Sequence, residues 1–277
     1  MNRHEEMQSS EARGVIRNAV AAFNSGRYED AELSCEQGLS RQPQEPTLNH
    51  LLAAMLFKRG DFAYAHKRIE VSLAVDPNNK AALLLAGRIA RAEKDFEGAL
   101  SYLKRAAELA QNAEILLETA RTLDESGSPA QAEDVWRVIL KALPDCTEAL
   151  AKLGRLAWEN GSHGEAVALL ERAAKKDAPA SVWFNLGLAK QDLRDHVGAA
   201  AAYRRALRRK ADYAEAAMNL GVVLQNAGDL DGAIEAYGEA YRLRHSMFGV
   251  IAMALTSAPY GRIWLEENEL RKLLQAD

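Results

Sequence analysis

Residues 183–203 read WFNLGLAKQDLRDHVGAAAAY, and residues 217–237 read AMNLGVVLQNAGDLDGAIEAY with small residues at the same places. In each stretch a glycine is followed twelve residues later by an alanine, Gly187 by Ala199 and Gly221 by Ala233. Such a pair of small residues occurs seven times, and its first members are Ala19, Ala53, Gly87, Ala120, Gly154, Gly187 and Gly221. Successive pairs lie 33 or 34 residues apart. A period of this length is typical of a solenoid of two-helix repeats.

The spacing inside each pair is constant, whereas both one-residue deletions fall between one pair and the next. We therefore infer that a rigid helical hairpin is repeated, since small residues let two helices approach closely. Glycine followed by aspartate, as in Gly60-Asp61 and Gly228-Asp229, supplies a C-cap and then an N-cap between the helices. The sequence predicts helices near 12–25, 28–41, 46–59, 62–75, 80–93, 96–110, 113–126, 129–142, 147–160, 163–176, 180–193, 196–209, 214–227 and 230–243, and no strands.

The residues around each pair resemble the tetratricopeptide repeat, whose pattern is Trp-x2-Leu-Gly-x2-Tyr followed by alanine, an aromatic residue and proline. The sixth copy has Trp183, Leu186 and Gly187, then Ala199 and Tyr203. The closing proline is Pro43, Pro77 or Pro144 in three of the copies. The resemblance implies an all-α, right-handed superhelical solenoid of seven helix-turn-helix repeats with a C-terminal capping segment.

The implied organisation has three parts. Residues 1–11 are expected to be a flexible N-terminus, residues 12–246 the seven-repeat solenoid, and residues 247–277 a cap helix and tail. The repeats, numbered one to seven, are 12–45, 46–79, 80–112, 113–146, 147–179, 180–213 and 214–246.

The composition argues against a membrane protein. Of the 277 residues, 48% are hydrophobic and 27% are charged, with a net charge of −4. Residues 1–11 lack the apolar run of a signal peptide, and no stretch approaches the ~18 uncharged apolar residues of a membrane span. Cys35 and Cys146 lie in different repeats, so we expect free thiols in a reducing compartment. We accordingly expect a cytoplasmic protein, and its richness in alanine and arginine suggests a bacterial source.

No catalytic or metal-binding constellation is apparent. The histidines are His4, His50, His66, His163, His196 and His245, and no two have the spacing of metal ligands. The glycines are explained by turns, caps and close helix crossings, which leaves no phosphate-binding loop. The carboxylates lie on helix surfaces, without a pair placed for acid–base catalysis. We therefore expect no enzymatic activity, no cofactor and no metal.

One basic run, residues 204–210 with the sequence RRALRRK, lies on the second helix of repeat six. Because Tyr203, Ala206 and Leu207 face inward, its cations face outward on the convex side. Such a run could bind nucleic acid. However, the chain is acidic, no aromatic residue is interleaved on that exposed face, and cations near a helix C-terminus complement its dipole. These observations argue against nucleic acid as a partner.

The resemblance implies that the first helices of the repeats line a concave groove, where members of the family bind their partners. The candidate partner-binding residues at these positions are His50, Phe57, Leu84, Arg88, Arg91, Arg121, Arg155, Trp158, Phe184, Asn185 and Asn219. Asn185 and Asn219 occupy equivalent positions and resemble the asparagine ladder of O-linked N-acetylglucosamine transferase, whose amides hold a peptide backbone.

Arg88, Arg121 and Arg155 also share one repeat position and form an arginine ladder. Arg121 and Arg155 each have a glutamate four residues on, with which an internal ion pair could form. Arg88 has no such partner within its helix, so Arg88 and Arg91 are the foremost candidates for binding a ligand. The residue set of a dicarboxylate clamp, found in chaperone-tail-binding relatives, is not supplied by any three consecutive repeats, which argues against that partner.

Several functions stay open at this point. The leading one is a non-catalytic scaffold or adaptor whose groove captures a peptide or helical segment of another protein. An alternative is a regulatory or sensor subunit that binds a small ligand, which would need a closed pocket. A self-assembling scaffold that uses its C-terminal tail is a further alternative.

The C-terminal segment differs from an ordinary solenoid cap. Residues 247–255 read MFGVIAMAL, apolar on every side, and a helix of this kind must be buried all round. Repeat seven can cover only one flank, so the other flank needs the rest of the chain or another molecule. The sequence predicts that the tail folds back as an atypical cap, with docking on a second copy as the alternative. The residues expected to take part are Phe248, Ile251, Trp264, Leu265, Leu270 and Leu273, and a homodimer is therefore possible.

Overall fold

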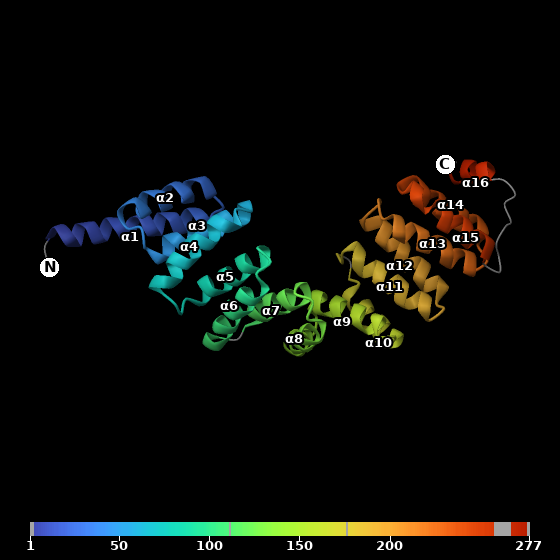
Figure 1. Ribbon diagram of the computed structural model, residues 1–277, viewed down its shortest axis with the longest axis horizontal. Coiled ribbons are helices and arrows are strands. Elements are labelled where there is room, and N and C mark those ends of the chain that lie inside the picture. Colours follow the sequence, from blue (N-terminus) through green and yellow to red (C-terminus); the bar gives the residue numbers. More distant parts are fainter. Residues whose placement is uncertain (1–2, 111, 176, 258–266, 276–277) are drawn as a thin grey trace. The chain divides into compact units, whose positions relative to one another are not determined.

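The computed structural model describes residues 3–110, 112–175, 177–257 and 267–275, which form helices joined by short connections (Figure 1). In chain order the elements are α1 (Arg3–Asn24), α2 (Tyr28–Arg41), α3 (Pro46–Arg59), α4 (Phe62–Val75), α5 (Lys80–Ala92), α6 (Phe96–Leu109), α7 (Ala113–Glu125), α8 (Pro129–Ala142), α9 (Thr147–Glu159), α10 (His163–Ala173), α11 (Ala180–Asp192), α12 (His196–Arg209), α13 (Ala214–Asn226), α14 (Leu230–Leu243), the 3₁₀ helix η1 (His245–Met247), α15 (Phe248–Ser257) and α16 (Glu267–Gln275). No strand occurs in these residues. The predicted all-α solenoid is confirmed.

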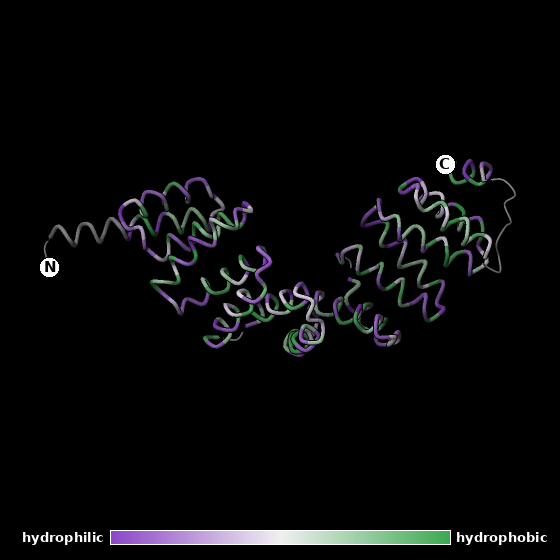
Figure 2. The backbone as a smooth tube through the Cα atoms, viewed as in Figure 1, coloured by the Kyte–Doolittle hydropathy of each residue, from purple (hydrophilic) through white to green (hydrophobic). Residues whose placement is uncertain are grey.

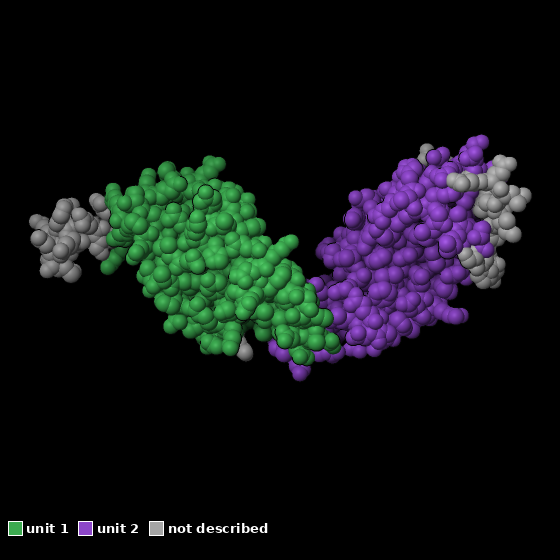
Figure 3. Space-filling model, in the orientation of Figure 1, with its two compact units in different colours: residues 1–135 green, residues 136–277 purple. Residues whose placement is uncertain are grey.

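The helices group into two compact units, Met1–Val135 and Trp136–Asp277, and the division falls within α8 (Figure 3). In each unit successive helices pack as antiparallel hairpins, and each helix buries its apolar face, so that hydrophobic and hydrophilic residues alternate along the tube of Figure 2. None of the described helices combines the length and the hydrophobicity needed to cross a bilayer.

Most helices begin and end within one residue of their predicted bounds. Two differ more. The first helix begins at Arg3, so much of the segment expected to be a flexible N-terminus belongs to α1. Helix α10 ends at Ala173, three residues early, and residues 174–179 connect it to α11. Pro179 disfavours helical geometry in Ala178, the residue before it, so α10 does not continue into α11.

The glycines of the repeated pairs make room for a large side chain sixteen residues later. A Cβ atom built on Gly187 would lie 2.5 Å from Cε1 of Tyr203, and one on Gly221 would lie 2.5 Å from Cε1 of Tyr237. Gly87 stands in the same relation to Leu103, at 2.8 Å from Cγ. The inner packing of these hairpins therefore depends on the absence of a side chain at the glycine.

Glycine also determines which aspartates act as helix caps. The carboxylates of Asp95, Asp195 and Asp229 each accept a hydrogen bond, of 2.9–3.0 Å, from the backbone N–H of a glycine three residues on. At the same position Asp61 makes no such bond, and the residue three places after it is Tyr64. A Cβ atom on Gly98 would lie 2.1 Å from the carboxylate of Asp95, so a side chain there would crowd the cap. The predicted side-chain cap at Asp61 is therefore wrong.

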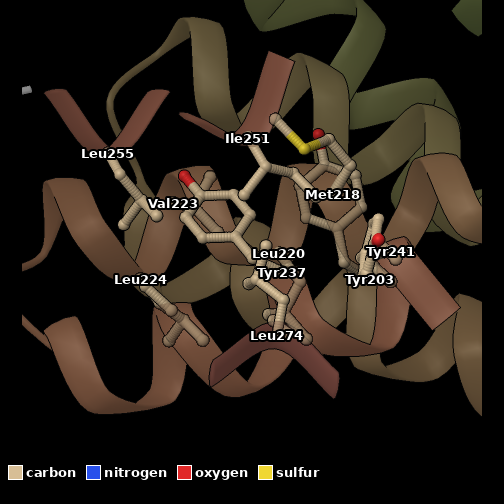
Figure 4. Packing of buried hydrophobic residues seen from close by; sticks show 14 of the residues in the cluster. Tyr203, Met218, Leu220, Val223, Leu224, Tyr237, Tyr241, Ile251, Leu255 and Leu274 are labelled. Atoms are coloured by element: carbon tan, nitrogen blue, oxygen red, sulfur yellow. The ribbon is translucent and has the colours of Figure 1, made fainter. Parts of the chain in front are cut away.

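The last repeat is covered by α15 and α16. Ile251 and Leu255 of α15 and Leu274 of α16 are buried in one cluster around Tyr237 (Figure 4). The opposite side of α15 is open, since Val250 is 57% exposed and Met253 68%. Within a single chain, therefore, only one flank of α15 is covered.

Helix α16 packs on α14 of the same chain. Leu270 is buried, Leu273 is half-buried, and Nη1 of Arg271 donates to the hydroxyl of Tyr241 at 3.0 Å. The guanidinium of Arg271 also lies over the ring of Phe248, 3.8 Å from its centroid. Two residues expected to take part in the cap, Trp264 and Leu265, lie outside the described residues.

Candidate functional site

Three of the predicted groove arginines converge on one buried carboxylate in unit 1. Glu118 of α7 has a side chain only 4% exposed. Its oxygens accept from Nε of Arg88 at 3.0 Å, from Nη2 of Arg91 at 3.2 Å and from Nη1 of Arg121 at 2.9 Å. Because a buried carboxylate is costly unless it is paired, these contacts offset the burial of Glu118 in the packed interface between α5 and α7.

Two exposed glutamates, Glu114 and Glu125, join Glu118 and the three arginines, and we call these six residues the Glu118 cluster. Arg88 also donates to Glu114 at 2.8 Å, and Arg91 donates to Glu125. The three arginines and three glutamates balance in charge, so the cluster presents no net positive charge to a ligand. The sequence prediction took account of ion pairs within one helix, and it therefore missed Glu118 as a partner of Arg88. The available signal was the placement of Glu114, Glu118 and Glu125 on the same helix face, one repeat after Arg88.

The apolar candidates of unit 1 pack inward. Leu84 is 8% exposed and belongs to the core formed by α3 to α7. Phe57 is half-buried, and its ring centroid lies 5.6 Å from that of Phe62. His50 is half-buried as well, and burial lowers its pKa, which favours the neutral imidazole. The contribution of these three residues is therefore mainly to the packing of repeats two and three.

In unit 2 the charged candidates also have partners. Arg155 forms the predicted ion pair with Glu159. Nε1 of Trp158 donates to a carboxylate oxygen of Asp192 at 2.6 Å, which links repeat five to repeat six. Part of each side chain stays accessible.

The two asparagines lie beside a tyrosine network. The hydroxyl of Tyr203 donates to Oε1 of Gln191 at 2.9 Å and is hydrogen-bonded by Asn219. Burial, followed by the nearby Asp192 carboxylate, raises the pKa of Tyr203, which therefore stays protonated. Phe184 packs against Tyr203, with 5.8 Å between ring centroids. Asn219 is thus held in place by the core behind it.

A set of half-buried side chains lies on the first helices α9, α11 and α13, and we call it the first-helix surface of unit 2. It consists of Trp158, Phe184, Asn185, Leu188, Asn219 and Val222, all half-buried. Phe184, Leu188 and Val222 also contact the core cluster of the last repeats, so their exposed edges are backed by packed side chains. A rigid apolar strip beside two side-chain amides can accept an extended or helical segment of another chain.

The opposite face of unit 2 carries the basic run. Arg204, Arg205 and Arg208 are exposed, as the sequence predicts. An aromatic residue of the neighbouring helix lies beside them, since the guanidinium carbon of Arg205 is 5.8 Å from the ring centroid of Trp183. Trp183 comes from α11, so the sequence of the basic helix by itself does not predict this contact. Within the described residues, no group of three or more His, Cys, Asp or Glu side chains is placed to hold a metal ion.

Comparisons with known proteins agree with the repeats. The family model described as tetratricopeptide repeat matches residues 50–114, 117–181 and 184–246. Tetratricopeptide repeat protein 8 of Caenorhabditis elegans is 26% identical over 196 residues, which is 69% of this chain. The chain spans 38% of the length of that curated relative.

Solved structures show the same fold. The structure of Pseudomonas aeruginosa pilF has a TM-score of 0.62 at 18% identity, over 72% of this chain and 92% of that chain. YrrB, described as a TPR protein with an unusual peptide-binding site, has a TM-score of 0.53 at 16% identity, over 66% of this chain and 95% of that chain. At these identities the likeness is one of fold. Since the family model matches more than half of its residues, the chain belongs to the tetratricopeptide repeat family.

Proposed function

We propose that this protein is a non-catalytic scaffold or adaptor that binds a peptide or helical segment of another protein on the first-helix surface of unit 2. The observation that carries the proposal is the pairing of half-buried apolar side chains with Asn185 and Asn219 at equivalent positions of adjacent repeats. Amides in register can bond a peptide backbone, while Phe184, Leu188 and Val222 receive apolar side chains. The described peptide-binding site of YrrB is a precedent within this fold.

The proposal gives the arginines of unit 1 a smaller part. A ligand carboxylate that approached Arg88 or Arg91 would have to replace Glu118 or its neighbours, which already accept from those guanidinium groups. Removing a partner from a buried ion pair is costly. Arg88, Arg91 and Arg121 therefore serve the interface between α5 and α7 first, and a partner gains little there.

We include a cytoplasmic location in the proposal. Both cysteines are free thiols: Cys35 is buried and Cys146 is half-buried, and they lie in different units. Burial, with smaller contributions from nearby glutamates, raises the pKa of Cys35 to about 11, so this thiol is protonated and unreactive. Free thiols are typical of a reducing compartment.

Site-specific photo-crosslinking tests the binding surface. A benzoylphenylalanine placed at Asn185 is expected to capture one discrete partner in cells, whereas the same group at the exposed Glu235 of α14 is expected not to capture that partner. Once the partner segment is identified, its affinity for the purified chain can be measured by titration calorimetry.

A pair of matched variants then decides between a specific surface and general adhesion. Asn185→Ala with Asn219→Ala should weaken the captured segment by about tenfold or more, as expected for the loss of two hydrogen-bonding groups. Asn160→Ala with Asn226→Ala changes two exposed amides at helix C-termini and should leave the affinity unchanged. Equal affinities in the two double variants would remove the first-helix surface as the binding site.

A further inference from the structure

An open hollow of about 600 Å³ is lined by residues of α10, α11 and α12 in unit 2. Trp183 and Leu186 come from α11, and Arg204, Arg205 and Arg208 come from α12. We call this cavity the α12 hollow. None of the residues of the first-helix surface, on which the proposed function rests, lines this hollow, so the two sites are distinct.

The repeat before it supplies an internal comparison. An equivalent hollow, lined by residues of α8, α9 and α10, has about 450 Å³. Two leucines that line that smaller hollow, Leu140 and Leu169, correspond to Ala174 and Ala202 in the α12 hollow. Leu153 of α9, which lines the smaller hollow, corresponds to Leu186 of the α12 hollow, so this lining position is leucine in both. The exchange of leucine for alanine at two lining positions therefore enlarges the α12 hollow.

An arginine shared by both hollows makes different contacts. In the smaller hollow Nη2 of Arg172 donates to the carbonyl oxygen of Pro144 at 2.7 Å. The equivalent arginine is Arg205, and Ala178 stands at the end of the preceding repeat, where the closing proline would be. Arg205 instead lies over the ring of Trp183, in cation–π contact. Within the described part of the chain the guanidinium of Arg205 forms no hydrogen bond, so its donors are available to another molecule.

The charge of the α12 hollow is not balanced from within. Lys190 is neutralised by Glu171 at 2.8 Å and by Asp195 at 3.4 Å. Over the part of the chain that the structure describes, the side chains of Arg204 and Arg208 form no ion pair or hydrogen bond with another residue. Together with Arg205 they leave three positive charges around an apolar floor, in a chain whose net charge is −4.

We propose that the α12 hollow binds an acidic peptide segment of a partner protein, with carboxylates on Arg204, Arg205 and Arg208 and an apolar side chain against Trp183. The planar guanidinium group matches a carboxylate with two parallel hydrogen bonds. Trp183 offers a flat apolar face beside these donors. The volume lies within the range of about 300–1,000 Å³ that is usual for ligand pockets.

Two observations favour a peptide over nucleic acid. Glu171 lines the hollow itself, and Asp177 lies 3.6 Å from Arg209, the last residue of α12. A continuous phosphate backbone that followed the three arginines would therefore also meet these carboxylates. The negative net charge of the chain also opposes a long polyanion, whose binding depends on many phosphate contacts. A short acidic segment interacts mainly with the three arginines of the hollow, and less with the net charge of the whole chain.

The test uses the full chain and a fluorescein-labelled peptide of alternating glutamate and phenylalanine, followed by fluorescence anisotropy. Arg204→Glu with Arg208→Glu should weaken the peptide by at least about tenfold. The control, Lys67→Glu with Lys104→Glu, makes the same charge change on the exposed sides of α4 and α6 and should change the affinity less than about twofold. Asn185→Ala with Asn219→Ala should leave this probe unaffected, which separates this site from the proposed function.

A filling variant provides a test that does not depend on charge. Ala202→Leu gives the α12 hollow the leucine that Leu169 supplies in the repeat before, and it should weaken the peptide by about tenfold while the far-ultraviolet circular dichroism stays unchanged. Equal loss in the two charge-reversal variants, or full affinity of Ala202→Leu, would overturn the proposal. A labelled single-stranded oligothymidine that binds more tightly than the peptide, and is lost in the same arginine variant, would overturn it in favour of nucleic acid. No peptide binding at millimolar protein would overturn it as well.

Discussion

Arg88 and Glu118, thirty residues apart in the sequence, are joined by a hydrogen bond of 3.0 Å from Nε to Oε1. The bond crosses from repeat three to repeat four, and Glu118 receives Arg91 and Arg121 as well. Arg88, which has no partner within its own helix and was predicted to bind a ligand, is therefore part of the interface between two repeats.

This interface should depend strongly on Glu118. Glu118→Gln keeps the shape but removes the charge that three guanidinium groups share, so we expect the free energy of unfolding to fall by about 1–3 kcal/mol. Urea denaturation followed by circular dichroism measures the loss. Glu114→Gln is the matched control, since that side chain is 56% exposed and should matter by less than about 0.5 kcal/mol. Similar losses in both variants would contradict the role given to Glu118.

The close approach of Gly187 to Tyr203 predicts that a single methyl group destabilises the sixth repeat. Gly187→Ala would place Cβ 2.5 Å from the tyrosine ring, and we expect a loss of about 1–3 kcal/mol. Gly164→Ala in α10 meets nothing within 4 Å and should be neutral or stabilising by up to about 1 kcal/mol. The melting temperature should therefore fall in Gly187→Ala and stay equal or rise in Gly164→Ala, and a comparable fall in both variants would refute the packing argument.

The C-terminal cap should act through α16. Leu270→Ala and Leu274→Ala each empty a buried site and should lower the free energy of unfolding by about 2–5 kcal/mol. Lys272→Ala, on the exposed side of the same helix, should change it by no more than about 0.5 kcal/mol. Light scattering on the intact chain distinguishes a cap from an exchanged segment, and we expect a monomer. A dimer that dissociates in the leucine variants would show that the tail docks on a second copy.

His66 predicts a pH dependence of stability. Nδ1 of His66 lies 2.6 Å from Oε2 of Glu93, and this hydrogen bond raises the pKa of the imidazole. Because the pKa is higher in the folded state, the contribution is full below the unfolded value of about 6.5 and is lost as the pH rises through the folded value. The difference in urea midpoint between the native chain and His66→Gln should thus be largest near pH 5 and vanish toward pH 9.

His50 should show the opposite dependence. Burial lowers its pKa, so protonation favours the unfolded chain, and the contribution of His50 is present above about pH 6.5 and is lost as the pH falls. His50→Gln should therefore flatten the acid side of the stability profile, and His66→Gln the alkaline side. A single profile shared by both variants would contradict the two assignments.

Much of the fold was readable from the sequence because its determinants are local. The pair of small residues, such as Gly187 and Ala199, acts within one hairpin, and the caps act within one turn, so helix bounds follow from short-range patterns. The cap helix α15 could be predicted for the same reason, but the exposure of its side chains could not. Whether Val250 and Met253 are covered depends on how many neighbours surround α15, which hydrophobicity does not tell.

The charged surfaces were decided by packing between repeats. From the sequence, Arg88 and Arg205 both look like unpaired arginines on helix surfaces. Yet Arg88 pairs with Glu118, whereas Arg205, among the residues that the structure describes, contacts the ring of Trp183 and no carboxylate. These neighbours lie on other helices, at distances along the chain that no helical period predicts. The sequence by itself determined where the helices lie and which residues they bury, because those interactions are local. Only the stacking of one hairpin on the next determined which cations are paired and which remain available to a partner, because a charge is neutralised by whatever lies beside it in space.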